Sequence, residues 1–137
     1  MNSEKKTMTP SVLAVDDSVA MRHILEATLN EGGYATTLAK DGRDALAKAL
    51  AAVAEERRFD LILTDQNMPG LNGLELIRAL RELSPYVDTP ILLLTTEDSE
   101  AFKDAAREAG ASGWLLKPLD PGVLTDVLTS VREAMQA

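Results

Sequence analysis

Residues 61–70 read LILTDQNMPG, in which three apolar residues lead into Thr64 and Asp65 and a loop-like stretch follows. A short, unbroken apolar run bounded by such a stretch is typical of a strand that is buried on both faces. Strands of this kind occur in parallel sheets that helices cover on both sides. The segment therefore predicts a buried parallel strand that ends in a carboxylate.

The same arrangement recurs along the chain, with a short apolar run followed by polar side chains. Four further strands are predicted: Val12–Val15 before Asp16 and Asp17, Ala35–Leu38 with a weaker pattern, Ile91–Leu94 before Thr95 and Thr96, and Trp114–Leu116 before Lys117 and Pro118.

Segments with helical spacing separate these strands. The predicted helices are one from Met21 that Gly32-Gly33 stops, one from Asp41 through Ala54, one from an Asn72/Glu75 capping box to Leu83, one containing Phe102–Ala109 that Gly110 ends, and one after Asp120-Pro121. About five β–α repeats predict an α/β domain with a doubly wound, five-stranded parallel sheet in the flavodoxin-like order 2-1-3-4-5. We expect residues 10–137 to form this domain and residues 1–9 to be a flexible segment.

The composition narrows the classes of function. The chain has 137 residues, enough for one domain, and its formal net charge is −8, so direct nucleic-acid binding is disfavoured. It contains no cysteine, which excludes disulfides and thiolate chemistry and agrees with a reducing compartment. No apolar run approaches the roughly 20 residues of a membrane span. We therefore expect a cytoplasmic protein that binds neither nucleic acid nor membranes.

The polar residues at the strand ends are predicted to converge, because ligands of such sheets lie beyond the carboxyl ends of the strands. Three carboxylates this close repel one another by roughly 4 kcal/mol per pair at 4 Å and an effective dielectric constant near 20. A divalent cation with oxygen ligands relieves this repulsion, and Mg²⁺ also tolerates phosphate as a ligand. His23 falls within a helix and is expected to be an ordinary surface residue.

These residues suit phosphoryl transfer to a carboxylate. Asp65 is the candidate nucleophile, Lys117 can neutralise a phosphoryl oxygen, and the Thr95 hydroxyl can donate to another. Each residue also has an ordinary structural explanation: Asp17 alone favours a helix cap, threonine suits strands, and Lys-Pro suits a turn. The coincidence of all four groups at neighbouring strand ends is what favours a site.

The chain resembles the receiver domains of response regulators, in particular the single-domain chemotaxis members of CheY type. The resemblance extends from about Val12 to Val131 and rests on four segments: Val15–Ser18, Thr64–Gly70, Leu94–Glu97 and Gly113–Pro118.

The resemblance implies a set of roles. Asp65 is the phosphorylation site; Asp17 and Asp65 bind Mg²⁺ directly, Asp16 binds it through a water molecule, and the backbone carbonyl of Asn67 completes the protein ligands. Lys117-Pro118 is expected to be a cis peptide. Asn67 and Glu97 tune dephosphorylation, and their pairing implies a phosphoryl lifetime well short of hours.

A conformational switch is also implied. On phosphorylation, Thr95 is expected to move toward the phosphoryl group, and the ring of residue 114 to fill the vacated space. That position usually holds Tyr or Phe and here holds Trp114. Gln66, beside the nucleophile, replaces an aromatic residue of some relatives.

The implied function is a monomeric, stand-alone phosphoacceptor rather than an enzyme. A histidine kinase would be its phosphodonor, and a flagellar motor switch or another signalling protein would bind the surface of the last two helices and the last strand. A phosphate sink and a phosphorelay shuttle would look nearly identical. An aspartyl phosphatase similar to haloacid dehalogenases would need an acid where Asn67 stands, and a flavin- or nucleotide-binding module would need a Gly-rich loop after the first strand.

Overall fold

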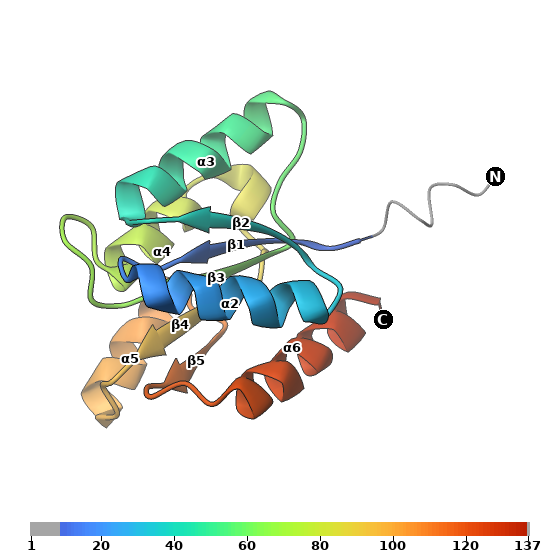
Figure 1. The fold of residues 1–137 in the computed structure, drawn as a ribbon. Coiled ribbons are helices and arrows are strands. Elements are labelled where there is room, and N and C mark those ends of the chain that lie inside the picture. The colour runs from blue at the N-terminus through green and yellow to red at the C-terminus, as the bar shows by residue number, and fades with distance from the viewer. Residues whose placement is uncertain (1–8, 137) are drawn as a thin grey trace.

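The strands predicted from the apolar runs form one sheet in a computed structural model that describes residues 9–136 (Figure 1). Residues 1–8, most of the segment predicted to be flexible, and Ala137 lie outside the described residues. The strands are β1 (Ser11–Val15), β2 (Ala35–Ala39), β3 (Leu61–Asp65), β4 (Ile91–Thr95) and β5 (Gly113–Leu116).

A helix follows each of the five strands, and the first four helices connect one strand to the next. The helices are α2 (Val19–Glu31), α3 (Gly42–Ala54), α4 (Gly73–Arg81), α5 (Glu100–Ala109) and α6 (Pro121–Gln136), with a short 3₁₀ helix, η1 (Ser84–Tyr86), between α4 and β4. Among residues 9–136, no helix combines the length and the apolar character needed to cross a membrane.

The sheet has the order β2-β1-β3-β4-β5, and every neighbouring pair is parallel. This order confirms the doubly wound fold predicted from the sequence. The weakly patterned run at 35–38 is a strand that extends to Ala39, and it lies at the edge of the sheet. An edge strand has a neighbour on one side only, which explains why its residues are less apolar than those of β1, β3 and β4.

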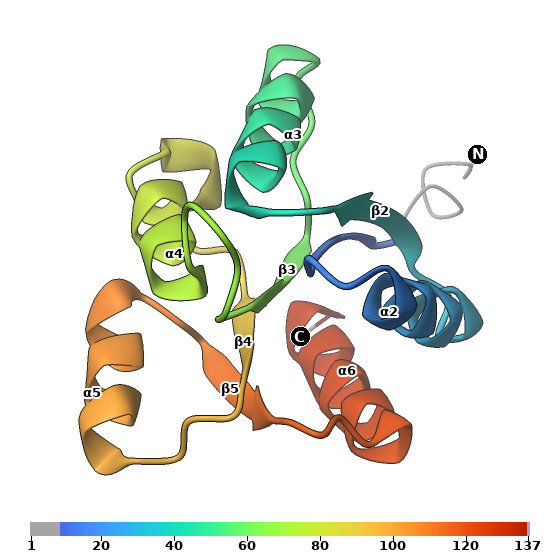
Figure 2. The same ribbon diagram turned by 60° about the vertical axis from the view of Figure 1, so that its left-hand side comes forward.

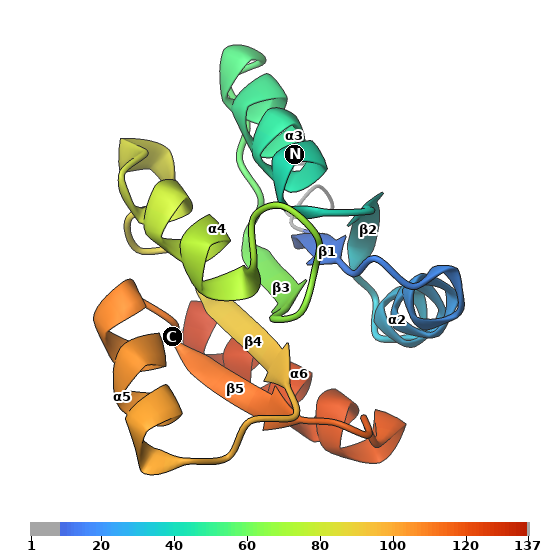
Figure 3. The same ribbon diagram turned by 90° about the vertical axis from the view of Figure 1, so that its left-hand side faces the viewer.

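The sheet lies between two layers of helices (Figures 2 and 3), and an apolar core fills the space between the sheet and each layer. Helices α3, α4 and α5 cover one face, where Leu13, Ile62 and Leu93 meet residues such as Leu76. Helices α2 and α6 cover the other face, where alternate residues of the same strands meet residues such as Leu25. Because successive residues of a strand point to opposite faces, each central strand contributes to both cores.

Side-chain caps set the starts of the helices. Asp41 accepts from the Asp44 N–H, and Asn72 and Glu75 form the predicted capping box. The helix predicted to reach Leu83 ends at Arg81, so this boundary was wrong. Pro85 explains the earlier end, because its nitrogen cannot donate to the Arg81 carbonyl and the chain instead makes a tight turn at η1.

The core on the α3–α5 face should contribute strongly to stability. Leu13→Ala removes a fully buried side chain from β1 and should lower the free energy of unfolding by about 2–5 kcal/mol. The matched control is Leu50→Ala on α3, whose side chain is 46% exposed and whose loss should change stability by less than about 0.5 kcal/mol. Urea unfolding of both variants measures the difference. Equal losses would contradict this assignment of the core.

Candidate functional site

The register of the sheet brings the polar strand ends to one edge. Val15 pairs with Thr64, so Asp16 and Asp65 stand at the same level on neighbouring strands. Thr95 pairs with Leu116, which places Lys117 just beyond it on the next strand. The predicted convergence of the candidate residues therefore follows from strand pairing alone.

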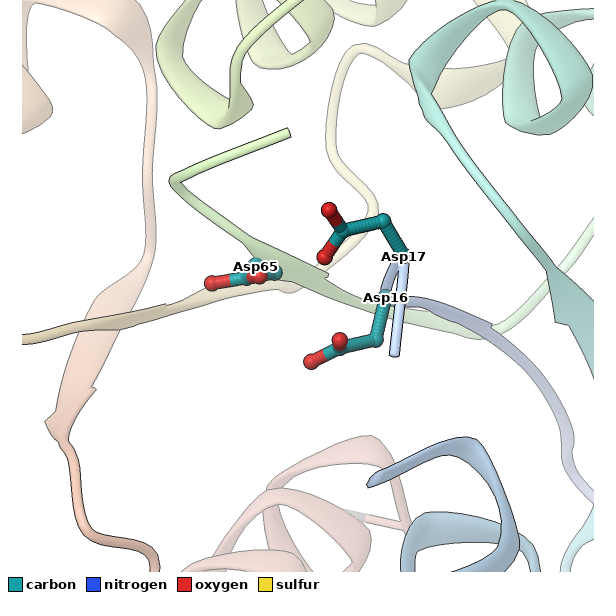
Figure 4. A group of neighbouring side chains, drawn as sticks. All are labelled: Asp16, Asp17 and Asp65. Atoms are coloured by element: carbon teal, nitrogen blue, oxygen red, sulfur yellow. The ribbon is translucent and has the colours of Figure 1, made fainter. Parts of the chain in front are cut away.

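Three carboxylates form a compact group at this edge (Figure 4). Asp16 and Asp17 leave the end of β1, Asp65 ends β3, and one carboxylate oxygen from each lies within 4.8 Å of the others. Asp16 and Asp65 are buried, whereas Asp17 is exposed. The group thus combines like charge, close approach and limited access to water.

Asp16 is a buried carboxylate with one oxygen that lacks a hydrogen bond within residues 9–136. Its Oδ1 accepts from the Ser18 N–H at 2.9 Å, whereas its buried Oδ2 has no hydrogen-bond partner among the described residues. Burial raises the pKa of the Asp16 carboxyl, the Ser18 N–H opposes this change, and the Asp65 carboxylate raises the pKa further. A buried acceptor without a donor is a position where a bound cation would lower the energy.

Ser18, rather than Asp17, caps α2. The Ser18 side chain accepts from the Met21 N–H at 3.2 Å, so the cap interpretation of Asp17 was wrong. Asp17 is the second residue after β1, and its side chain points toward Asp65 (Figure 4). Its side chain is therefore available to the carboxylate group.

Lys117 is the cation of the site. Its Nζ donates to Asp65 Oδ1 at 2.8 Å and lies 3.7 Å from Asp16 Oδ2. The Asn67 N–H also donates to Asp65 Oδ1, at 3.4 Å. The peptide bond between Lys117 and Pro118 is cis. Lys117 thus partly neutralises two buried carboxylates from the neighbouring strand ends.

The remaining predicted residues lie on β4 and β5, in the loops after β3 and β4, and on α2. Thr95 is fully buried, and its Oγ1 accepts from the Glu97 N–H at 2.9 Å. Trp114 pairs in register with Leu93, two residues before Thr95, and packs against the core of the α3–α5 face. Glu97 and Asn67 are exposed. His23 is exposed on α2, as predicted.

Three basic residues near the site were not predicted from the sequence. Arg22 donates to the Asp16 carbonyl at 2.6 Å. The Arg107 guanidinium and the Lys103 ammonium lie 5.2 Å and 6.0 Å from the centre of the Trp114 ring. The spacing of four residues between Lys103 and Arg107 places them on one helix face, which was the available signal.

The ligand set suits a hard divalent cation. Every candidate ligand in the group is a carboxylate oxygen, which is the donor type that Mg²⁺ and Ca²⁺ prefer. Only one histidine and no cysteine occur in the chain, so zinc or copper would lack their usual ligands here. The three aspartates therefore fit a hard divalent cation such as Mg²⁺.

A five-stranded parallel domain with this acidic edge and its lysine matches a known class of protein. Residues 12–129 match the response regulator receiver domain family, and the chain belongs to that family. Receiver domains are phospho-accepting switches rather than enzymes in the usual sense.

The similar proteins include single-domain chemotaxis receivers. Chemotaxis protein CheY1 of Helicobacter pylori is 39% identical over 121 residues, which cover 88% of this chain and 94% of that protein. Among solved structures, chemotaxis response regulator CheY4 of Vibrio cholerae has a TM-score of 0.81 at 45% identity, covering 90% of this chain and 99% of that chain. A response regulator protein from Burkholderia multivorans has a TM-score of 0.70 at 54% identity, covering 91% and 96%. The resemblance drawn from the sequence is confirmed.

The repulsion at Asp16 should be measurable without a metal. In metal-free buffer at neutral pH, Asp16→Asn should raise the free energy of unfolding by on the order of 1 kcal/mol. This gain is smaller than the roughly 4 kcal/mol of an isolated like-charged pair, because Lys117 offsets part of the repulsion. The gain should shrink as the pH falls through the raised pKa of Asp16, since the wild-type carboxyl is then protonated in the folded state. Urea unfolding at several pH values tests this.

In excess divalent cation, the wild type should be more stable than Asp16→Asn. Metal binding stabilises the folded state, and the variant has lost one carboxylate that would hold the metal. A destabilised Asp16→Asn variant in metal-free buffer would show that the carboxylates do not repel one another appreciably.

Proposed function

We propose that this chain is a stand-alone response regulator of a two-component phosphorelay, with Asp65 accepting a phosphoryl group from a histidine kinase in the cytoplasm. The observation that supports this most directly is the pairing of Lys117 Nζ with Asp65 Oδ1 at 2.8 Å inside the group of three carboxylates. A nucleophilic carboxylate beside a fixed cation is the arrangement that phosphoryl transfer requires.

In the proposed reaction, a carboxylate oxygen of Asp65 attacks the phosphorus of a phosphohistidine. The new O–P bond forms as the P–N bond breaks, and the histidine imidazole leaves with the electron pair of the broken bond. Lys117 then faces both the acyl phosphate and Asp16, and its charge offsets the added negative charge. Water later attacks the phosphorus, releases inorganic phosphate and restores the Asp65 carboxylate.

Mg²⁺ is the proposed cofactor. Asp16, Asp17 and Asp65, with the backbone carbonyl of Asn67, would hold it, and the unpartnered Oδ2 of Asp16 supports the assignment. When bound, Mg²⁺ supplies positive charge that counters the carboxylates and the phosphoryl oxygens. The chain's own part is to keep these oxygen atoms together at the strand ends.

Asn67 and Glu97 flank the site in positions suited to tuning the attack of water. The Asn67 N–H contacts Asp65, and the Glu97 N–H contacts Thr95, so both exposed side chains begin next to the reacting groups. We propose that they keep the phosphoryl lifetime well short of hours, which suits a transient signal.

The signal would leave through protein contact on the surface of α5, β5 and α6. Leu116 at the end of β5 is 44% exposed and Val123 in the first turns of α6 is 48% exposed, which gives this surface apolar contact area. The similarity to CheY1 and CheY4 supports a role in chemotaxis, with a flagellar motor switch as the downstream target. The chain would act as a monomer.

Phosphorylation at Asp65 is tested by incubating the chain with Mg²⁺ and acetyl phosphate and measuring its intact mass. The wild type should gain one phosphoryl group and lose it within hours after the donor is removed. Asp65→Asn should gain none, because an amide oxygen cannot form the acyl phosphate. The matched control is Asp60→Asn just before β3, which should behave as the wild type. Labelling of Asp65→Asn would refute the proposal.

The proposed switch links Thr95 to Trp114 on one face of the sheet. Leu93 and Thr95 are two residues apart and point to the same face, and Trp114 is the register partner of Leu93. Arg107 and Lys103 lie over the Trp114 ring, and such cation–π contacts contribute roughly 0.5–1 kcal/mol at exposed positions. The two cations therefore stabilise the position that the ring would have to leave.

Arg107→Ala should make the switch easier to trigger. The variant should lose about 1 kcal/mol of the stabilisation of the present ring position. Beryllofluoride, a phosphoryl analogue, should then change the Trp114 fluorescence at a lower concentration. The midpoint of this titration should fall by roughly fivefold. Trp114 is the only tryptophan, so the signal is specific. Glu108→Ala on the same helix is the control and should leave the midpoint unchanged. A midpoint that stays fixed or rises in Arg107→Ala would contradict the switch.

A further inference from the structure

Gln66 follows the nucleophile and makes three hydrogen bonds that reach two other elements. Its N–H donates to the Leu94 carbonyl at 2.9 Å, which extends the pairing of β3 with β4. Its carbonyl accepts from the Gly73 N–H at 3.0 Å, and its side-chain Oε1 accepts from the Leu74 N–H at 3.0 Å. The Gln66 side chain is buried although it is polar. Gln66 therefore joins the end of the nucleophile's strand to the start of α4.

The two bonds that Gln66 accepts satisfy half of the N–H groups that lack a helical partner at the start of α4. The first four N–H groups of a helix have no partner within the helix. Here Gln66 accepts from two of them, Gly73 and Leu74, and the Asn72 side chain accepts from a third, Glu75. The fourth, the Asn72 N–H, donates to the Glu75 side chain. The two residues cap the same helix from opposite ends of the loop 67–72.

Gly73 shows how closely α4 approaches Asp65. A Cβ atom at this position would lie 2.6 Å from Leu93 Cδ1, 2.7 Å from the Asp65 carbonyl oxygen and 2.9 Å from Gln66 Cα. Only glycine leaves room for the helix to start against the backbone of the nucleophile. The loop 67–72 therefore has both of its ends fixed within hydrogen-bond distance of Gln66.

The position of Asn67 depends on how the ends of the loop 67–72 are held. Its N–H donates to Asp65 Oδ1 at 3.4 Å, which is a long bond, so a small displacement of the loop would break it. Asn67 is exposed, and its side chain makes no hydrogen bond among the described residues. Its backbone is held by its neighbours in the chain, of which Gln66 is the first.

We propose that the Gln66 carboxamide is a positioning residue for phosphoryl transfer. It holds the Leu74 N–H and so fixes the loop 67–72, which keeps the Asn67 backbone at the Asp65 carboxylate. This inference rests on the proposed phosphorylation of Asp65. It adds that the residue after the nucleophile acts through the loop, without touching the reacting atoms.

The experiment separates positioning from simple capping of α4. Gln66→Met keeps the length of the side chain and removes its oxygen acceptor, whereas Asn72→Ala removes the other side-chain cap of the same helix. For both variants, calorimetric titration with Mg²⁺ gives the dissociation constant, the rate of phosphorylation by acetyl phosphate is measured at saturating Mg²⁺, and urea unfolding gives the stability.

Gln66→Met should weaken Mg²⁺ binding and slow phosphorylation by about tenfold each, the usual range for residues that orient a metal ligand. Asn72→Ala should keep the wild-type dissociation constant and rate even where it lowers stability. Wild-type values in Gln66→Met, or equal losses in both variants, would overturn the positioning role. Failure of the wild type itself to accept phosphate would instead refute the proposed function.

A second variant decides the matter if Gln66→Met does not fold. Gln66→Glu retains an oxygen acceptor for the Leu74 N–H on a side chain of nearly the same shape. It should therefore bind Mg²⁺ at least as tightly as the wild type. Weaker Mg²⁺ binding by Gln66→Glu would overturn the proposal.

Discussion

The site depends on the parallel register of four strands. The pairings of Val15 with Thr64 and of Thr95 with Leu116 bring the last residues of β1, β3, β4 and β5 to one edge. A shift of one residue in any strand would turn its terminal side chain to the opposite face. Crowding the carboxylates at this edge destabilises the fold, and the burial of apolar strand residues in two cores offsets this effect.

The two faces of the sheet carry different residues of the site. Asp65 has the strand parity of Leu61 and Leu63, which belong to the core beneath α2 and α6. Thr95 and Trp114 have the parity of Leu93, which belongs to the core beneath α3, α4 and α5. The carboxylates and Lys117 thus gather at the strand ends, while the residues proposed to report their state lie under α5.

The fold and the main site were predictable because they follow from patterns along the chain. Apolar runs that end in acids, a threonine and a lysine predicted the sheet order and the convergence of Asp16, Asp65, Thr95 and Lys117. The role of Ser18 as the cap of α2 was missed because an aspartate and a serine are equally good caps. The contacts of Gln66 with Leu74 and of Arg107 with Trp114 were not predictable, since they depend on the path of a loop and the packing of a helix.

The two separate cores have a consequence for how such a chain can change over time. Residues beneath α2 and α6 share no core with Trp114, so their substitution can alter stability without changing the residues that pack against the Trp114 ring. Residues beneath α3, α4 and α5 share a core with Trp114, so a change there affects both stability and the packing of that ring. The continuous sheet therefore separates the interior into two parts, and only the part beneath α3, α4 and α5 packs against Trp114.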